Sequence, residues 1–185
     1  SSELAARLRF FLPRDLPKIG GPLAELAVAG ALPPGPVWRV LDVGAGMGAT
    51  TLGTAAFARS LGGIERLEVL ASDHDARALD VSTSLARSAG HGALALASVP
   101  VALETRALDL EASDLVLPTG PFDLVLVGLV LNELFGARSP SEALAASAAL
   151  VRGLFARLSP LGALVIVEPA LLVRSPHSSL RALKC

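Results

Sequence analysis

The sequence predicts a doubly wound α/β fold with a mostly parallel sheet, and three observations support that prediction. Apolar segments of strand length alternate with helical segments along the 185 residues, which is the pattern of parallel strands joined by crossover helices. Hydrophobic residues make up 52% of the chain, as expected when strands are buried on both faces. A glycine-rich turn, Gly44-x-Gly46-x-Gly48, joins the first strand to the helix that follows it.

Two helices are expected ahead of the sheet. The first covers Glu3–Leu12 and should end at Pro13, which has no backbone N–H to continue a helix. The second covers Leu16–Ala29 and should end at the proline-rich turn that follows. We therefore expect an N-terminal helical cap over residues 1–36 and a core over residues 37–185.

The core elements are expected to alternate along the chain. Five strands are predicted at Trp38–Val43, Leu67–Ser72, within Ala102–Leu108, at Phe122–Val127 and at Ala163–Val167. Helices are predicted at Ala49–Ser60, Ala76–Ala89 and Pro140–Leu158. The last helix has a clear start, because Ser139 can cap it and Glu142 falls at its third position. A turn at residues 159–162, Ser-Pro-Leu-Gly, should lead into the fifth strand.

Acidic residues occur at the ends of separate strands. Asp42, Asp73, Asp109 and Glu168 each close or follow an apolar strand. Ligands of open parallel sheets bind beyond the carboxyl ends of the strands. The sequence therefore predicts one ligand site formed by these strand ends and the glycine turn, where a helix N-terminus adds partial positive charge.

Two nucleotide cofactors fit the glycine turn. Residues 44–49 also satisfy the dinucleotide fingerprint, so an NAD-binding oxidoreductase stays an alternative. Asp42 favours S-adenosylmethionine, because a carboxylate there would repel a pyrophosphate and attract the ammonium group of a methionine moiety. The sequence near the helix N-terminus has no Lys or Arg to hold phosphates. Asp73 would then accept hydrogen bonds from the ribose hydroxyls, and Asp109 would reach the adenine amino group.

Together these segments resemble a class I methyltransferase over residues 38–169. The resemblance implies a Rossmann-like fold and S-adenosylmethionine as the cofactor. The residues expected to bind the cofactor are Asp42, Gly44, Ala45, Gly46, Gly48, Asp73, His74, Asp109, Leu110 and Gly128. Asn132 and Glu133 are the catalytic candidates, Glu133 as a base and Asn132 as an orienting group; a cap and an exposed charge are the alternatives. Glu168 either lines the pocket or pairs with an Arg.

A narrower resemblance rests on short segments. Phe11–Lys18, Leu129–Leu134 and Glu168–Ala170 with Arg181 resemble the methyltransferase-like assembly factors of the mitochondrial small ribosomal subunit and their bacterial relatives. This resemblance implies association with small-subunit ribosomal RNA and a cysteine-bound iron–sulfur cluster. Such a cluster takes four thiolates, whereas the sequence contains only Cys185. Because the methyltransferase fold continues with two more strands, we expect its C-terminal strands to be missing from this sequence.

Composition narrows the remaining possibilities. The formal net charge of −1 gives no bulk attraction to nucleic acid. His74, His91 and His177 lack the spacing of metal ligands, so no metal site is expected. No apolar run reaches the length of a membrane span, and the absence of a signal peptide indicates a cytoplasmic setting. The methyl acceptor stays open between ribosomal RNA and a small molecule, and a non-catalytic RNA-binding factor that retains the pocket is a further alternative.

Overall fold

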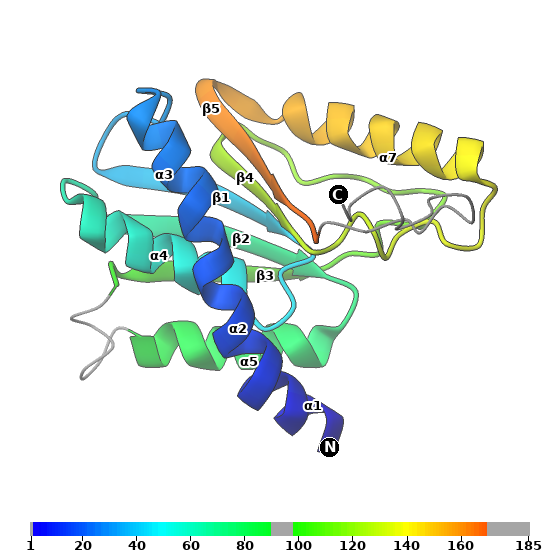
Figure 1. Ribbon diagram of the computed structural model, residues 1–185, viewed down its shortest axis with the longest axis horizontal. Coiled ribbons are helices and arrows are strands. Elements are labelled where there is room, and N and C mark those ends of the chain that lie inside the picture. Colours follow the sequence, from blue (N-terminus) through cyan, green and yellow to red (C-terminus); the bar gives the residue numbers. More distant parts are fainter. Residues whose placement is uncertain (1, 90–97, 170–185) are drawn as a thin grey trace, which may run out of the picture.

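The computed structural model describes residues 2–89 and 98–169, which form a parallel sheet with helices on both faces (Figure 1). The sheet order is β3-β2-β1-β4-β5, and every neighbouring pair is parallel. The strands are β1 (Val37–Val43), β2 (Arg66–Asp73), β3 (Val101–Ala107), β4 (Phe122–Gly128) and β5 (Leu158–Val167). The chain runs outward from β1 to β3 and returns to β4 beside β1, so the switch point lies between β1 and β4. This topology confirms the predicted Rossmann-like parallel sheet.

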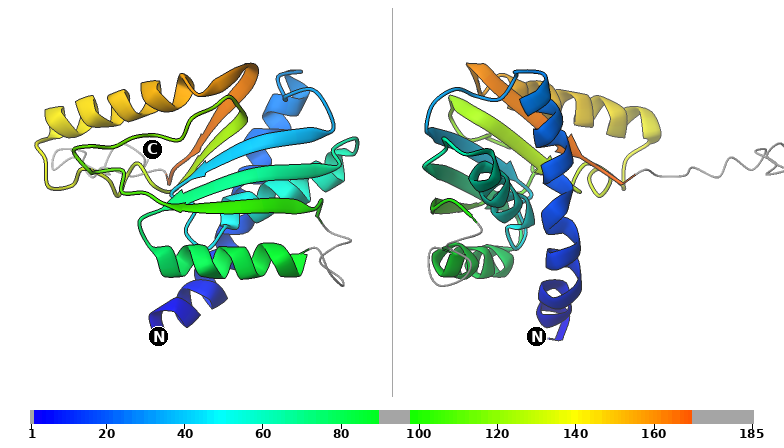
Figure 2. Two further views of the ribbon diagram at one scale, coloured as in Figure 1. Left: turned by 180° about the vertical axis from the view of Figure 1, so that it is seen from behind. Right: turned by 60° about the vertical axis from the view of Figure 1, so that its left-hand side comes forward.

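Helices bury both faces of the sheet (Figure 2). α4 (Ala49–Leu61) and α5 (Ala76–Ala89) pack on one face of the sheet, in a hydrophobic core that includes Leu124 of β4. α7 (Pro140–Phe155) packs on the opposite face, in a second hydrophobic core that includes Val125, the residue after Leu124. Successive side chains of a strand point to opposite faces of the sheet. Because helices cover both faces, neighbouring side chains of a central strand are both buried. This explains why the central strands read as continuous apolar runs.

The N-terminal residues form one continuous helical run that crosses the α4 side of the molecule (Figure 2). It consists of α1 (Ser2–Ala6), a π-helical turn η1 (Arg7–Phe11), α2 (Leu12–Asp15), a 3₁₀ turn η2 (Leu16–Ile19) and α3 (Gly20–Val28). The prediction that Pro13 ends a helix was therefore wrong. Pro13 and Pro17 each lie in the first two positions of a new segment. The change of hydrogen-bond pattern there leaves no need for the missing N–H of proline.

This helical run approaches α4 very closely at Gly53. A Cβ at Gly53 would collide with the carbonyl oxygen of Leu16 and would lie 2.6 Å from the side chain of Ile19. Glycine is therefore what permits the contact between η2 and α4. The contact brings the preceding residues of the run to the carboxyl edge of the sheet, where the predicted site lies.

Two predicted boundaries at the C-terminal side need correction. α7 ends at Phe155, and β5 already begins at Leu158. The turn expected at residues 159–162 lies within β5. Phe122 pairs with Leu158, whereas Leu124, two residues further along β4, pairs with Ala163, so the register of β5 shifts at this point. The start of α7 is as predicted: the Ser139 hydroxyl and the Glu142 carboxylate accept hydrogen bonds from each other's backbone N–H.

Some predictions fall beyond these observations. Ala170, Arg181, Cys185, His91 and His177 lie outside the described residues. The division into a cap and a core at residue 36 stays a prediction. Within residues 2–89 and 98–169, no helix is long and apolar enough to cross a membrane.

Candidate functional site

A cavity of about 900 Å³ lies at the carboxyl edge of the sheet. The glycine turn, the ends of β2 and β4, the segment after β3 and the N-terminal helical run line it. Its position next to the switch point between β1 and β4 is where open α/β sheets bind ligands. Its volume is within the range of small-molecule and cofactor sites.

The glycine turn has a backbone that only glycine adopts easily. Gly44, Gly46 and Gly48 have φ angles of +67°, +52° and +85°, in the left-handed region that L side chains disfavour. A Cβ at Gly44 would collide with Val130, and one at Gly48 would lie 2.5 Å from the hydroxyl of Ser82. Gly46, in contrast, faces the cavity. The turn is therefore shaped by local φ angles and by close packing from two other segments.

Asp73, the last residue of β2, holds the glycine turn through its side chain. One carboxylate oxygen accepts from Gly46 N at 2.8 Å, and the other accepts from Asp75 N at 2.8 Å. The first oxygen retains capacity for a further hydrogen bond, and the second also lies 3.4 Å from His74 Nδ1. Asp73 is only 9% exposed, while the neighbouring His74 side chain is 82% exposed. Asp73 thus presents polar atoms to the cavity from a fixed position.

Asp42 has a different environment from the other strand-end carboxylates. It is fully buried and does not line the cavity. The Thr51 hydroxyl donates to one oxygen at 2.6 Å, and the other oxygen has no hydrogen-bond partner. Burial raises the pKa of Asp42 to about 6, although the Thr51 hydroxyl acts to lower it. The structure therefore exposes no surface of Asp42 for the direct contact with an ammonium group that the sequence led us to expect.

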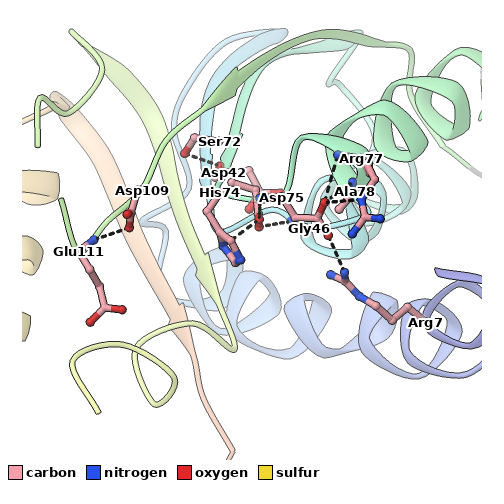
Figure 3. Close-up of polar contacts among 11 residues, drawn as sticks. Arg7, Asp42, Gly46, Ser72, His74, Asp75, Arg77, Ala78, Asp109 and Glu111 are labelled. Atoms are coloured by element: carbon pink, nitrogen blue, oxygen red, sulfur yellow. Dashed lines mark hydrogen bonds and ion pairs between the residues drawn. The ribbon is translucent and has the colours of Figure 1, made fainter. Parts of the chain in front are cut away.

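A second acidic group lies after β3, on the other side of the cavity from the glycine turn (Figure 3). Asp109 accepts from Glu111 N at 2.9 Å, and Glu111 accepts from Phe135 N at 2.7 Å. Leu110 lies between them and is 8% exposed. These bonds order the segment after β3 and tie it to the segment after β4.

The loop after β4 contains both catalytic candidates, and they differ in position. Glu133 lines the cavity, whereas Asn132 does not. The Asn132 amide donates to Glu168 at 2.8 Å. Glu168 also accepts from Val130 N and Leu131 N at 2.8 Å and 2.7 Å. In the part of the chain that the structure describes, these hydrogen bonds, rather than the predicted cavity lining or Arg pairing, account for the Glu168 carboxylate.

One cation from the N-terminal helical run, Arg7, reaches the glycine turn. The Arg7 guanidinium lies 3.7 Å from the position of a Cβ on Gly46 and forms an ion pair with Asp75 at 2.9 Å (Figure 3). The expectation that no Lys or Arg stands near the helix N-terminus was therefore wrong. The reason is tertiary: the run crosses the edge of the sheet, so a residue 39 positions before Gly46 in the chain becomes its neighbour in space.

Carboxylates outnumber Lys and Arg side chains in the lining of the cavity. Its lining includes six carboxylates and three Lys or Arg side chains. Arg14 and Lys18 both pair with Asp15, at 2.9 Å and 2.7 Å. Although burial acts to raise the pKa of Asp15, these two cations keep it below its usual value. A ligand therefore meets cations that already have partners.

The structure brings most of the predicted site residues together. The predicted residues that line the cavity are Gly44, Ala45, Gly46, Asp73, His74, Asp109, Leu110, Gly128 and Glu133. Asp42, Gly48 and Asn132 do not line it. Sequence reasoning missed lining residues from the N-terminal run, among them Arg7 and Phe11, and found no role in the site for Glu111. No local pattern marks them, since they reach the site only through tertiary packing.

Three solved structures to which this chain is similar are described as methyltransferases or candidate methyltransferases. A candidate methyltransferase from Bacillus halodurans has a TM-score of 0.50 at 22% identity, over 80% of this chain and 52% of that one. An arsenic(III) S-adenosylmethionine methyltransferase from Chlamydomonas reinhardtii has 0.49 at 25% identity, over 74% and 41%. A candidate S-adenosylmethionine-dependent methyltransferase from Methanococcus maripaludis has 0.49 at 14% identity, over 89% and 60%.

The similarity to the Bacillus halodurans protein shows a shared fold, the Rossmann-like fold of methyltransferases. This chain spans from 30% to 60% of the length of such solved chains. No model of a known protein family matches the sequence, and no curated protein matches it by sequence.

Proposed function

We propose that this chain is an S-adenosylmethionine-dependent methyltransferase domain. One observation carries the proposal: a left-handed glycine turn and the strand-end acids Asp73 and Asp109 line one cavity at the switch point of a methyltransferase fold. Each of these features occurs in other sheets, but their meeting in one cavity requires the correct strand order. The sequence spans only part of comparable solved chains, so activity, acceptor and partners are all part of the proposal.

The residues present suit this cofactor. Gly46 lines the cavity beside the Arg7 guanidinium and has no side chain of its own to keep a ligand away from the backbone. Asp73 can accept from the ribose hydroxyls once the exposed His74 side chain leaves one of its oxygens, and Asp109 with Leu110 would contact the adenine. The excess of carboxylates in the lining favours a ligand that carries sulfonium and ammonium charges.

The same charges disfavour the NAD alternative. A pyrophosphate needs unpaired donors or cations, and Arg7 is already bound to Asp75 while Arg14 and Lys18 share Asp15. An anion would have to break these pairs and would add negative charge beside Asp73. NAD binding therefore has no electrostatic advantage in this cavity.

The chain's own residues would mainly bind and orient the reactants. S-adenosylmethionine, when bound, supplies a methyl group on a sulfonium that a nucleophile displaces in line. Holding reactants in that geometry accounts for most of such catalysis. Glu133 lines the cavity and can accept a proton where the acceptor must lose one. Asn132 would act through the loop that Glu168 holds, rather than by contact with the acceptor.

For the acceptor, we propose small-subunit ribosomal RNA. The support is the sequence resemblance, together with one structural observation. Two of the segments that carry the resemblance, Leu129–Leu134 and the segment starting at Glu168, join through three hydrogen bonds. They therefore form one local unit rather than separate matches. A small-molecule acceptor and a non-catalytic assembly factor are the alternatives, and a cytoplasmic location stays a prediction.

Two measurements test the proposal. Calorimetry with S-adenosylmethionine and with NAD should give binding of the first only; binding of NAD alone would overturn the cofactor assignment. Methyl transfer to unmodified small-subunit ribosomal RNA should exceed transfer to a panel of small amines, alcohols and thiols. Cofactor binding without transfer to any of these would favour the assembly factor.

A further inference from the structure

Glu168 makes an unusual set of contacts at the end of the sheet. It directly follows β5 and accepts three hydrogen bonds from consecutive residues of the loop after β4. Two come from backbone N–H groups, those of Val130 and Leu131, and the third comes from the Asn132 amide. Bonds from N–H donors to an ionised carboxylate are short and strong. One side chain therefore fixes the start of the loop.

That loop starts in a conformation that needs support. Leu129 has a φ angle of +62°, which costs a non-glycine residue free energy and persists only where surrounding structure holds it. Leu129 N donates to Val167 O at 2.7 Å, so the bond just before Glu168 contributes to the same hold. The two neighbouring strand ends thus fix the loop jointly, through main chain and side chain.

The fixed loop forms one wall of the cavity. Val130 packs so tightly against the glycine turn that a Cβ at Gly44 would collide with it. Glu133 N donates to Val130 O at 3.0 Å, and this turn leads the Glu133 side chain to the cavity lining. The position of both residues therefore depends on where the backbone of residues 129–132 is held.

We infer that Glu168 is a positioning residue, which orders the loop after β4 so that Val130 closes on Gly44 and Glu133 faces the cavity. The inference rests on the proposed function in one respect: the ordered wall serves the binding of S-adenosylmethionine. It does not make Glu168 a catalytic residue, because Glu168 does not line the cavity. Its carboxylate acts through the three loop groups that it binds.

Four variants separate this role from a general effect on stability. Glu168→Ala removes the two oxygens that accept the three hydrogen bonds. Glu168→Gln keeps one oxygen that can accept from both backbone N–H groups, and its amide can donate to a reoriented Asn132. Glu168→Asp keeps the charge but shortens the reach. Glu142→Ala is the matched control, because Glu142 is also hydrogen-bonded, in the capping box of α7, and lies outside the cavity.

The first measurement is hydrogen exchange of the Val130 and Leu131 amides in the protein without ligand. We expect exchange to accelerate at least about tenfold in Glu168→Ala and Glu168→Asp, while Glu168→Gln stays close to the wild type. Glu142→Ala should lower the melting temperature without a specific change at these two amides. If Glu168→Ala leaves the two amides protected, or affects them no more than Glu142→Ala does, the inference is overturned.

The second measurement is the dissociation constant of S-adenosylmethionine by calorimetry. Glu168→Ala should weaken binding about tenfold, the factor expected when the ordered loop falls to about a tenth of the population. Glu168→Gln should recover most of the affinity. Unchanged affinity in Glu168→Ala would overturn the positioning role even if exchange changes. If the wild type itself does not bind S-adenosylmethionine, the proposed function fails, and the exchange measurement still decides whether Glu168 orders the loop.

Discussion

Asp42 should make the folded protein less stable as the pH rises through about 6, because burial raises its pKa from 3.8 to about 6. The unfolded chain has the ordinary value, so between these two pH values the folded state binds more protons than the unfolded state. Stability then falls with rising pH, and the full penalty is present above the folded pKa. This trend is opposite to that of most paired carboxylates, whose contribution grows with pH.

The size of the effect follows from the shift. A difference of about two units, at 1.36 kcal/mol each, gives about 3 kcal/mol in total, of which about 2 to 3 kcal/mol falls between pH 4 and pH 7. Asp42 is fully buried, so solvent screening does not reduce this value. Substitution by Asn keeps the shape and removes the titration, although both N–H donors of its amide then lack an acceptor. That cost does not depend on pH and cancels in a comparison across pH.

The assay compares denaturant unfolding of the wild type and Asp42→Asn from pH 4 to pH 7. The stability of Asp42→Asn relative to the wild type should rise by about 2 to 3 kcal/mol over this range. Asp80→Asn is the matched control for the general effect of replacing an aspartate, because Asp80 is an exposed aspartate of α5, and the change across pH for Asp42→Asn should exceed the change for Asp80→Asn. A constant difference for Asp42→Asn, or a carboxyl titration of Asp42 with its midpoint near 4, would refute the reasoning.

Three further predictions concern the site and the fold. Asp73→Asn should weaken S-adenosylmethionine binding by about 1.5–3 kcal/mol in calorimetry, the value of a hydrogen bond to a charged group, while Asp80→Asn should leave affinity unchanged. Gly44→Ala should destabilise the protein by about 2–4 kcal/mol in denaturant unfolding, since it adds left-handed strain to a collision with Val130; Val130→Ala in the same chain should recover part of this loss, and no recovery would contradict the packing argument. Ser139→Ala should cost about 1 kcal/mol of stability through the lost cap, with binding unchanged.

The parts of the fold that the sequence predicted are those with local causes. Apolar runs fix where β1 and β4 lie, and left-handed φ angles require glycine in the turn after β1. The start of α7 depends on Ser139 and Glu142 alone, so its capping box was visible in the sequence. Each of these signals involves neighbours in the chain, and tertiary structure did not override them.

The errors have tertiary causes. Pro13 reads as a helix end because a regular helix cannot accommodate it, yet changes to π-helical and 3₁₀ turns keep the run continuous. The position of Arg7 beside Gly46 depends on that continuity and on the close contact at Gly53. A sequence pattern contains no signal for the approach of segments so far apart in the chain.

Asp42 and Asp73 show why a strand-end carboxylate alone does not define a contact. Asp73 is the last residue of β2, beyond which the chain turns, so its oxygens reach across the edge of the sheet to Gly46. Asp42 is followed by one more residue of β1, and its side chain is buried beneath the glycine turn, against Thr51 of α4. Asp42 pairs with Ala71, so a register difference of two residues separates the carboxylate that lines the cavity from the one that titrates in the core. Its influence on a cationic ligand would act across the turn, as an electrostatic effect that depends on its protonation.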